Sequence, residues 1–527
     1  MQDKGSDNAN NSFFRENIDP HVKNLLKHFT ESAFTIEAPE SINDKPIYET
    51  TLYLATCKNL EMDCGSFTAY IFQDIIHKGY IIALAFGDIF NEKSFYTRIH
   101  SSCVTSETLQ ACDCDCSEQL QKSLEIIVKN KVGIFFYLMQ EGRGVGYIAK
   151  ARDRMLVQAT NDEISTFEAY QLLGLRKDYR QYRNIRPICK MLNIDPEFIL
   201  LTNNPQKIHD LRHLGIKIKR TETLESQPSP YNLAYLRSKM EAGHLLKEPR
   251  LAHLARVRPP KPVIPFKPHT FDEEKRYILT ASYFLPIRPV DDEIILSSSK
   301  FYDYFNDTLI NELNKSNNQI ILEYKKTRNN RYKIKLNKSN FFKYIRKNPE
   351  SPINIILNLP YWFQIFVYFD IINNEELILL TYGIQKAKDI PLVRIQHEAL
   401  FNRFPLKDIY YKRTYQEAVK KIVTYGVGII ILLNSDTRGI GFGAYAQNIM
   451  LKQGGISINP AQLFDRFGVN CNLSDYEGPL SILKRHIQGQ KIQMILDSPK
   501  RTERKAAYTE ILETLDVEVS KWIFLKK

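Results

Sequence analysis

The stretch "HSSCVTSETLQACDCDCSEQL" (100–120) holds four of the eight cysteines of this 527-residue chain within fourteen positions. Cys112, Cys114 and Cys116 alternate with aspartates, and Cys103 lies a short loop upstream. Cysteines at this spacing close disulfide rings poorly, whereas thiolates that converge from two turns suit one soft cation such as zinc. From spacing alone, a catalytic zinc site, a structural zinc site and a group of buried thiols all stay open.

The composition is that of an ordinary soluble globular chain, with 43% hydrophobic and 25% charged residues and room for two to four domains. The net charge of +12 suits an anionic partner: a phosphorylated small molecule, nucleic acid or a membrane surface. Residues 1–45 are expected to be a disordered or extended lead-in, because their polar start has no apolar core of signal-peptide length. The apolar stretch 353–369 is too short and too interrupted to span a bilayer, so we expect buried strands there. A reducing, cytoplasmic location with no membrane partner follows as the expectation, and it disfavours disulfides.

Two strand-to-helix turns downstream are suited to phosphate. The stretch 131–155 begins as a continuous apolar strand, passes through the turn "QEGRGVG" (140–146) and ends as a basic helix. Its glycines let backbone N–H groups approach an anion closely, and Arg143 offers a bidentate guanidinium. The same pattern returns at "EFILLTNNPQKIHDL" (197–211), where Lys207 falls in the first turn of the expected helix, at the usual place for a bound phosphate. Either turn alone is weak evidence, since many α/β loops look like this.

Taken together, these segments resemble GTP cyclohydrolase II, the zinc enzyme that opens the riboflavin pathway. The resemblance runs from about Leu52 to Leu246 in seven ordered blocks. They are "FGDI" (86–89), "RIHSSC" (98–103), "CDCSEQL" (114–120), "QEGRGVG" (140–146), "TFEAYQLLGLRKDYR" (166–180), "LLTNNPQK" (200–207) and "KMEAGHLL" (239–246). The resemblance implies an α/β fold with mixed sheets, and it places the three zinc thiolates on Cys103, Cys114 and Cys116, so that Cys112 is an extra.

The implied reaction is hydrolytic opening of the imidazole ring of GTP, with release of formate and pyrophosphate to give a diaminopyrimidinone ribosylamino phosphate. The resemblance implies one Zn²⁺ per chain and Mg²⁺ on the triphosphate, with Asp178 as proton acceptor and Arg180 as nucleophile toward the α-phosphate. The implied substrate-binding positions are Arg98, His100, Ser101, Ser102, Gln119, Glu141, Gly142, Arg143, Thr166, Thr202 and Lys207. Without the family context, Asp178 and Arg180 would be interpreted as a solvated charged turn.

Three departures bear on the activity. Ser102 stands where the family usually has Glu, "VTSET" (104–108) replaces a stretch with a Gly-Asp pair, and Arg154 occupies the place of a catalytic tyrosine. A guanidinium in place of a phenol exchanges a proton donor for a fixed cation. Metal binding is expected to survive these changes. Two alternatives to GTP ring opening therefore stay open: action on a different nucleotide ring, and a non-catalytic nucleotide-binding pseudoenzyme.

The second half repeats the first. Gly87 and Arg98 recur as Gly383 and Arg394, each 296 positions later. The stretch 418–451 repeats 123–156, including its glycine-rich turn, and "MILDSPKRTE" parallels "ILLTNNPQKI". Internal repetition of this kind predicts a duplicated scaffold, and the resembling enzymes are homodimers, so we expect a pseudo-dimer within one chain. A further homodimer of chains is a possible addition.

The chemistry is not repeated. Ala399, Tyr410 and Lys412 stand at the positions of Cys103, Cys114 and Cys116, and Glu477 stands near that of Arg180. The second copy is therefore expected to bind no zinc. We therefore expect four parts in the chain. A lead-in (1–45) precedes a zinc-bearing GTP cyclohydrolase II-like domain (46–247), and a proline-rich basic linker (248–275) connects it to a degenerate GTP cyclohydrolase II-like domain (276–527).

A basic, aromatic-bearing segment within 320–348 alternates apolar and basic positions as a hairpin would. It is the best candidate for a contact with nucleic acid or another anionic surface. The same pattern is more often one solvated face of a sheet, and nucleic-acid binding ranks last among the hypotheses.

Overall fold

The computed structural model describes the chain in several ranges. They are 50–226, 228–246, 257–262, 276–288, 293–297, 321–327, 331–337, 340, 360–383, 390–407, 410–433, 441–456, 462, 468, 475–487 and 489–525. The lead-in 1–45 and most of the linker 248–275 lie outside these ranges. Within them, no helix combines the length and the apolar character that a bilayer crossing requires.

The first copy is built on a seven-stranded mixed sheet, in the order β1-β2-β3-β5-β4-β6-β7. Its strands are β1 (Thr51–Met62), β2 (Gly65–Asp74), β3 (Tyr80–Phe86), β4 (Ser94–Ser101), β5 (Gly133–Leu138), β6 (Glu197–Leu201) and β7 (Ile218–Glu222). Its helices are α3 (Val104–Glu107), α4 (Cys116–Lys129), the 3-10 turn η1 (Gly142–Gly144), α5 (Tyr147–Ala159), α6 (Thr166–Leu172), α7 (Ile185–Met191), α8 (Pro205–His213) and α9 (Leu233–Glu241). Antiparallel pairs run from β1 to β5, and parallel pairs continue through β4 and β6 to β7. Every residue of the central β5 is buried, as expected for a strand covered on both faces.

The second copy has the same architecture. Its sheet has the order β8-β12-β13-β15-β14-β16-β17, which matches the first strand by strand. The strands are β8 (Tyr277–Ile287), β12 (Tyr361–Asp370), β13 (Glu375–Tyr382), β14 (Leu392–His397), β15 (Gly428–Leu433), β16 (Lys491–Leu496) and β17 (Glu518–Phe524). The helices are the 3-10 turn η3 (Leu400–Arg403), α14 (Tyr410–Tyr425), α15 (Phe442–Gln453), α17 (Glu477–Leu483) and α18 (Thr502–Thr514). The predicted duplication and the predicted α/β class are confirmed.

One glycine pair shows how closely the two scaffolds agree. Gly87 and Gly383 have φ angles of +70° and +73°, where L side chains are strained. A Cβ atom would come within 2.1 Å of the Lys131 carbonyl oxygen at the first position and 2.0 Å of the Gly426 carbonyl oxygen at the second. Both turns therefore require glycine for the same reason.

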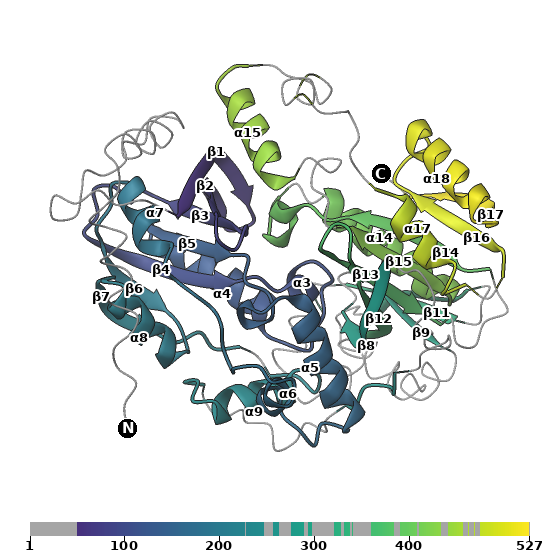
Figure 1. The fold of residues 1–527 in the computed structure, drawn as a ribbon, viewed down its shortest axis with the longest axis horizontal. Coiled ribbons are helices and arrows are strands. Elements are labelled where there is room, and N and C mark those ends of the chain that lie inside the picture. Colours follow the sequence, from purple (N-terminus) through teal and green to yellow (C-terminus); the bar gives the residue numbers. More distant parts are fainter. Residues whose placement is uncertain are drawn as a thin grey trace.

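The two copies pack reciprocally (Figure 1). Helix α5 of the first copy lies against β8 of the second, and α15 of the second lies against β1 of the first. Two isolated bridges follow the same exchange, Met62 with Leu406 and Ala111 with Ile287. One hydrophobic cluster unites Tyr147 of the first copy with the interior of the second sheet. The predicted intramolecular pseudo-dimer is thus present as two tandem domains with a shared interior.

The basic segment folds as expected. Strands β10 (Ile321–Lys326) and β11 (Arg331–Leu336) pair antiparallel as a hairpin, and β11 also pairs with β9 (Glu293–Ser297). Within 353–369, the described part lies in the buried strand β12.

Candidate active site

The three cysteines that the resemblance assigns to zinc converge beyond the end of β4. Cys103 is the N-cap residue of α3, and Cys114 and Cys116 lie at the start of α4. Their Sγ atoms all lie within 4.8 Å of one another, and those of Cys103 and Cys114 are 3.8 Å apart. Zn–S bonds of about 2.3 Å in a tetrahedron place two sulfurs roughly 3.8 Å apart, so this donor set fits zinc and leaves a fourth position for water.

Cys112 has a different role. Its thiol donates to the Pro286 carbonyl oxygen at 3.4 Å, and its backbone N–H donates to the same oxygen at 2.9 Å. Burial raises the pKa of this thiol to about 12. Cys112 therefore fastens the loop to the second copy, and among the described residues the only group with metal-ligand spacing is the other three cysteines.

Asp115, between two of the cysteines, points into the protein and is 1% exposed. One carboxylate oxygen accepts from Lys239 Nζ at 2.5 Å, and the other accepts from Gln119 Nε2 at 2.7 Å and Ser226 Oγ at 2.9 Å. Burial opposes ionisation, but Lys239 holds the pKa of Asp115 below its usual value. The Cys-Asp-Cys turn is thereby attached to α9, which belongs to the last block of the resemblance.

Lys150 joins the cysteines, although nothing in the sequence singled it out. Its Nζ lies 3.1 Å from Cys103 Sγ and donates to Glu141 Oε1 at 2.7 Å. Glu141 in turn accepts from the Val104 backbone N–H at 2.7 Å through its other oxygen. Burial raises the pKa of Glu141 to about 7, against the opposing effect of Lys150. Helix α5 thus presents an ammonium group beside the thiols.

The glycine-rich turn positions Asp178 and Arg180. The Arg143 carbonyl accepts from the Tyr179 N–H at 2.9 Å, and a Cβ atom on Gly144 would lie 2.9 Å from the Tyr179 backbone. Only glycine permits this approach, and Gly144 also has a φ of +88°. Asp178 and Arg180 pair with each other through two guanidinium nitrogens. They form an ion pair in which the Arg180 side chain is 17% and the Asp178 side chain 35% exposed, so the charged turn that the local sequence suggests stays partly open to solvent.

Several cations gather around the turn. Arg98 donates to Gln119 Oε1 at 2.7 Å and to the Leu201 carbonyl at 2.9 Å, and Lys207 donates to the Ile99 carbonyl at 2.7 Å. Burial, with Arg98 and Arg180 nearby, lowers the pKa of Lys207 well below its usual value. The same crowding is recorded at His244, whose pKa falls to about 3 because of burial and of four cations, Lys239, Arg180, Arg143 and Lys207. We call the set Arg98, Arg143, Arg180, Lys207 and Lys239 the cation cradle. Lys239 and Arg180 already pair with Asp115 and Asp178, and an anionic ligand would relieve the repulsion that remains at Lys207.

The other implied substrate residues lie at or just beyond the ends of β4 and β6 and at the start of α6. His100 Nε2 is 2.8 Å from Glu107 Oε1, and its ring stacks between Phe135 and Tyr137. Ser102 is buried, and among the described residues the buried hydroxyl of Ser101 has no hydrogen-bond partner. Thr166 begins α6, which a capping box of Ser165 and Glu168 initiates, and Thr202 follows β6 directly.

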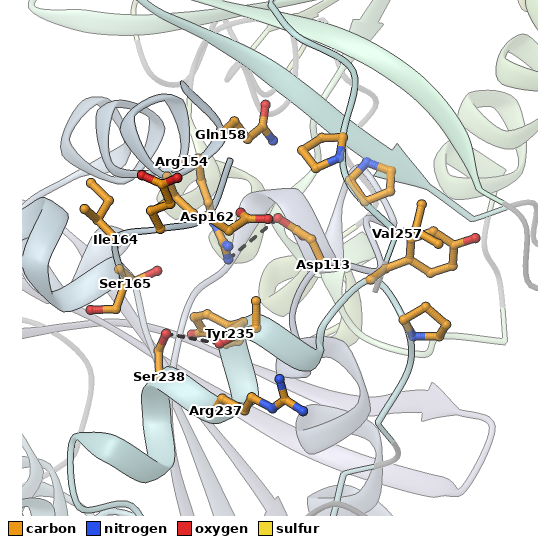
Figure 2. Close-up of a pocket in the computed structure, with 18 of the residues that line it drawn as sticks. Asp113, Arg154, Gln158, Asp162, Ile164, Ser165, Tyr235, Arg237, Ser238 and Val257 are labelled. Carbon is orange, nitrogen blue, oxygen red and sulfur yellow. Dashed lines mark hydrogen bonds and ion pairs between the residues drawn. The ribbon is translucent and has the colours of Figure 1, made fainter. Parts of the chain in front are cut away.

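Arg154 has a partner that the sequence analysis did not anticipate. Its Nη2 lies 3.6 Å from Asp113 Oδ2, and its guanidinium lies 4.9 Å from the centre of the Tyr235 ring. Figure 2 shows Arg154 and Asp113 facing each other on the wall of a cavity of about 390 Å³. Residues of α5, α6 and α9 line it, together with Pro286 and Trp362 of the second copy. The cavity therefore adjoins the cysteine loop and lies where the two copies meet.

The corresponding place in the second copy is built differently. Ala399 precedes η3 as Cys103 precedes α3, and Lys412 lies in the first turn of α14. Arg394 forms a buried ion pair with Asp497, which also lies 3.6 Å from Arg504. Glu477 is the first residue of α17, whereas Arg180 precedes α7 by five positions, and 471–474 lie outside the described ranges. Asp497 thus places a carboxylate beside two cations of this copy, Arg394 and Arg504.

Comparison with known proteins agrees with this geometry. The GTP cyclohydrolase II family model matches residues 54–223 and again 354–518, one match to each sheet. The chain belongs to the GTP cyclohydrolase II family. Three similar relatives are the GTP cyclohydrolase-2 proteins of Hahella chejuensis, Shewanella baltica and Shewanella sp. strain ANA-3. They are 38%, 34% and 34% identical over 195, 197 and 197 residues, which cover 37% of this chain in each case and 92%, 94% and 95% of the relative. Family membership implies a hydrolase of the GTP cyclohydrolase type.

Proposed function

We propose that the first copy is a zinc-dependent nucleotide cyclohydrolase that opens the imidazole ring of GTP, with release of formate and pyrophosphate. The observation that carries the proposal is the convergence of Cys103, Cys114 and Cys116 beside the cation cradle. Both parts are needed, because ring hydrolysis requires an activated water and the triphosphate requires charge neutralisation. Mg²⁺ on the triphosphate, a cytoplasmic location and any further association of chains belong to the proposal as expectations.

In this proposal each group has one task. Bound zinc would supply hydroxide near neutral pH, because it lowers the pKa of a bound water to about 7. The cation cradle holds the triphosphate, with Lys207 in the first turn of α8. Arg180, oriented by Asp178, faces the phosphate end of the substrate, and Asp178 is the proton acceptor. Lys150 neutralises the thiolate charge at Cys103, since its Nζ lies 3.1 Å from that sulfur.

The second candidate keeps the reaction class and changes the ring. The Arg154–Asp113 pair motivates it, because a fixed cation stands where the resembling enzymes have a phenol. A panel of purine and pyrimidine nucleoside triphosphates, assayed under identical conditions, separates the two candidates. Turnover of another nucleotide well above that of GTP would favour the second.

The test of the main proposal uses the full chain with GTP and Mg²⁺. We expect formate and a diaminopyrimidine chromophore to accumulate together. Arg180→Ala should retain zinc and lose turnover, whereas Lys177→Ala, an exposed basic residue three positions earlier, should retain both. If zinc-loaded protein yields no product from any nucleotide, the cyclohydrolase proposal is wrong and a non-catalytic, nucleotide-binding pseudoenzyme is the hypothesis that remains.

A further inference from the structure

A line of buried polar side chains crosses from the second copy into the cysteine loop. In the second copy, Arg403 donates through Nε to Glu398 Oε1 at 2.6 Å and through Nη1 to Tyr137 Oη of the first copy at 3.0 Å. Tyr137 donates to Glu107 Oε2 at 2.6 Å. The same carboxylate oxygen accepts from the Cys103 backbone N–H at 3.2 Å. Arg403 is therefore connected to the first cysteine through two intermediate side chains, and all four residues are buried.

The second copy also holds the rest of the loop between Cys103 and Cys114. Thr108 Oγ1 donates to Glu398 at 2.5 Å, and the Leu109 carbonyl accepts from Tyr415 Oη at 3.0 Å. The Gln110 carbonyl accepts from the Arg288 N–H at 3.1 Å. With the bonds of Cys112 to Pro286, each position from 108 to 110 and position 112 has a partner in the other copy. A loop of this length without such partners would have many conformations, and each fixed residue would lose conformational entropy when the metal orders the loop.

The duplication gives Arg403 a particular meaning. It lies 296 positions after Glu107, the same interval that separates Gly87 from Gly383. In a symmetric dimer the same residue would stand at both places. Here Glu107 occupies the position in the first copy and Arg403 the equivalent position in the second. The guanidinium of Arg403 interacts electrostatically with the carboxylates of both Glu398 and Glu107. The second copy has thus lost its cysteines and acquired a counter-charge for the first.

We infer that the second copy shapes the metal loop of the first, and that Arg403 is the positioning residue that sets Cys103 through Tyr137 and Glu107. This inference rests on the proposed metal site. Residues one shell beyond the ligands typically alter metal affinity by about 10- to 100-fold when removed, because they fix the orientation of the ligands.

The direction of the effect separates positioning from simple electrostatics. Arg403 is a cation, so its removal would by charge alone favour binding of another cation. If Arg403 acts by holding the loop, its removal weakens zinc binding instead. Arg403→Lys keeps the charge but loses the two-nitrogen contact to Glu398 and Tyr137, so it should restore little of the affinity.

The experiment measures zinc affinity of the full chain by competition with a chromophoric chelator, and kcat and KM for GTP in parallel. Arg403→Met should bind zinc at least about tenfold more weakly and lower kcat, with KM little changed because the cation cradle is untouched. Tyr415→Phe removes one hydroxyl that contacts the loop, and it should also lower the affinity for zinc, by a smaller factor than Arg403→Met. In a double-mutant cycle, Glu107→Gln should have much less effect in the Arg403→Met background than in the wild type.

Gln447→Ala is the matched control. Gln447 also donates across the boundary, to the Leu54 carbonyl of β1 at 3.3 Å, and within the described part of the chain no hydrogen bond joins it to residues 103–116. The zinc affinity of the Gln447→Ala variant should equal that of the wild type. Wild-type protein without zinc would overturn the proposed function itself. Zinc bound equally or more tightly by folded Arg403→Met, or weakened equally by Gln447→Ala, would overturn the positioning role alone.

Discussion

Asp115 gives the sharpest test of how the cysteine turn is held. Asp115→Asn removes a charge that is 1% exposed and leaves Lys239, whose side chain is 10% exposed, without its carboxylate partner. Removing one member of a buried ion pair typically costs about 3–5 kcal/mol, because the other charge stays desolvated. The amide oxygen can still accept two of the three hydrogen bonds that Asp115 accepts, those from Gln119 and Ser226, so we expect a loss near the lower end, about 3 kcal/mol, in the free energy of unfolding of the first copy.

The measurement is urea unfolding followed by circular dichroism at one fixed free zinc concentration, since bound metal adds its own binding energy to the folded state. Zinc release is recorded in the same samples. Glu118→Gln is the control, because Glu118 lies on the same helix turn and pairs with Lys122, with both side chains about one-third exposed. Such a pair contributes about 0.5 kcal/mol. A loss below about 1 kcal/mol for Asp115→Asn, or equal losses for both variants, would refute the role assigned to the buried pair.

Three further outcomes follow from the structure. Elemental analysis should find one zinc per chain in Cys112→Ser and none in Cys114→Ser, because the thiol of Cys114 belongs to the three-cysteine cluster and that of Cys112 does not. Calorimetric titration with a non-hydrolysable GTP analogue should give one site per chain, since Arg394 already pairs with the carboxylate of Asp497, whereas its counterpart Arg98 donates to neutral oxygens; two sites would contradict this. Burial lowers the pKa of His486 to about 3 from about 6.5 in the unfolded chain, so the unfolded state takes up the proton first. The stability that His486 contributes is therefore fully present above pH 6.5 and is lost at about 1.4 kcal/mol per pH unit below it, so His486→Gln should make the fall of the denaturant midpoints between pH 7 and 4 shallower.

The scaffold and the cysteine cluster could be predicted from the sequence because both depend on residues that are close together along the chain. Cys103, Cys114 and Cys116 lie on one short stretch, and the strand order of the second sheet follows from the repeat. The glycine-rich turn was also recognisable, since positive φ angles demand glycine at Gly144 and Gly146.

The remaining features depend on contacts between distant segments. Lys150 lies 47 positions after Cys103, so their contact depends on how α5 packs against the cysteine loop. Arg154 was visible as a departure, but its partner Asp113 lies on another loop. The eroded positions of the second copy could be identified as lost chemistry, whereas the contact of Arg403 with Tyr137 required the packing of the two copies. Sequence patterns specify local conformation far better than pairings across an interface.

The most direct test of the account combines metal analysis with product analysis on one preparation. We predict close to one zinc per chain and release of formate from GTP. Cys103→Ser should lose both the zinc and the formate release, whereas Arg180→Ala should lose only the formate release. Protein that releases formate after complete removal of zinc, or that holds no zinc when prepared without chelator, would contradict it.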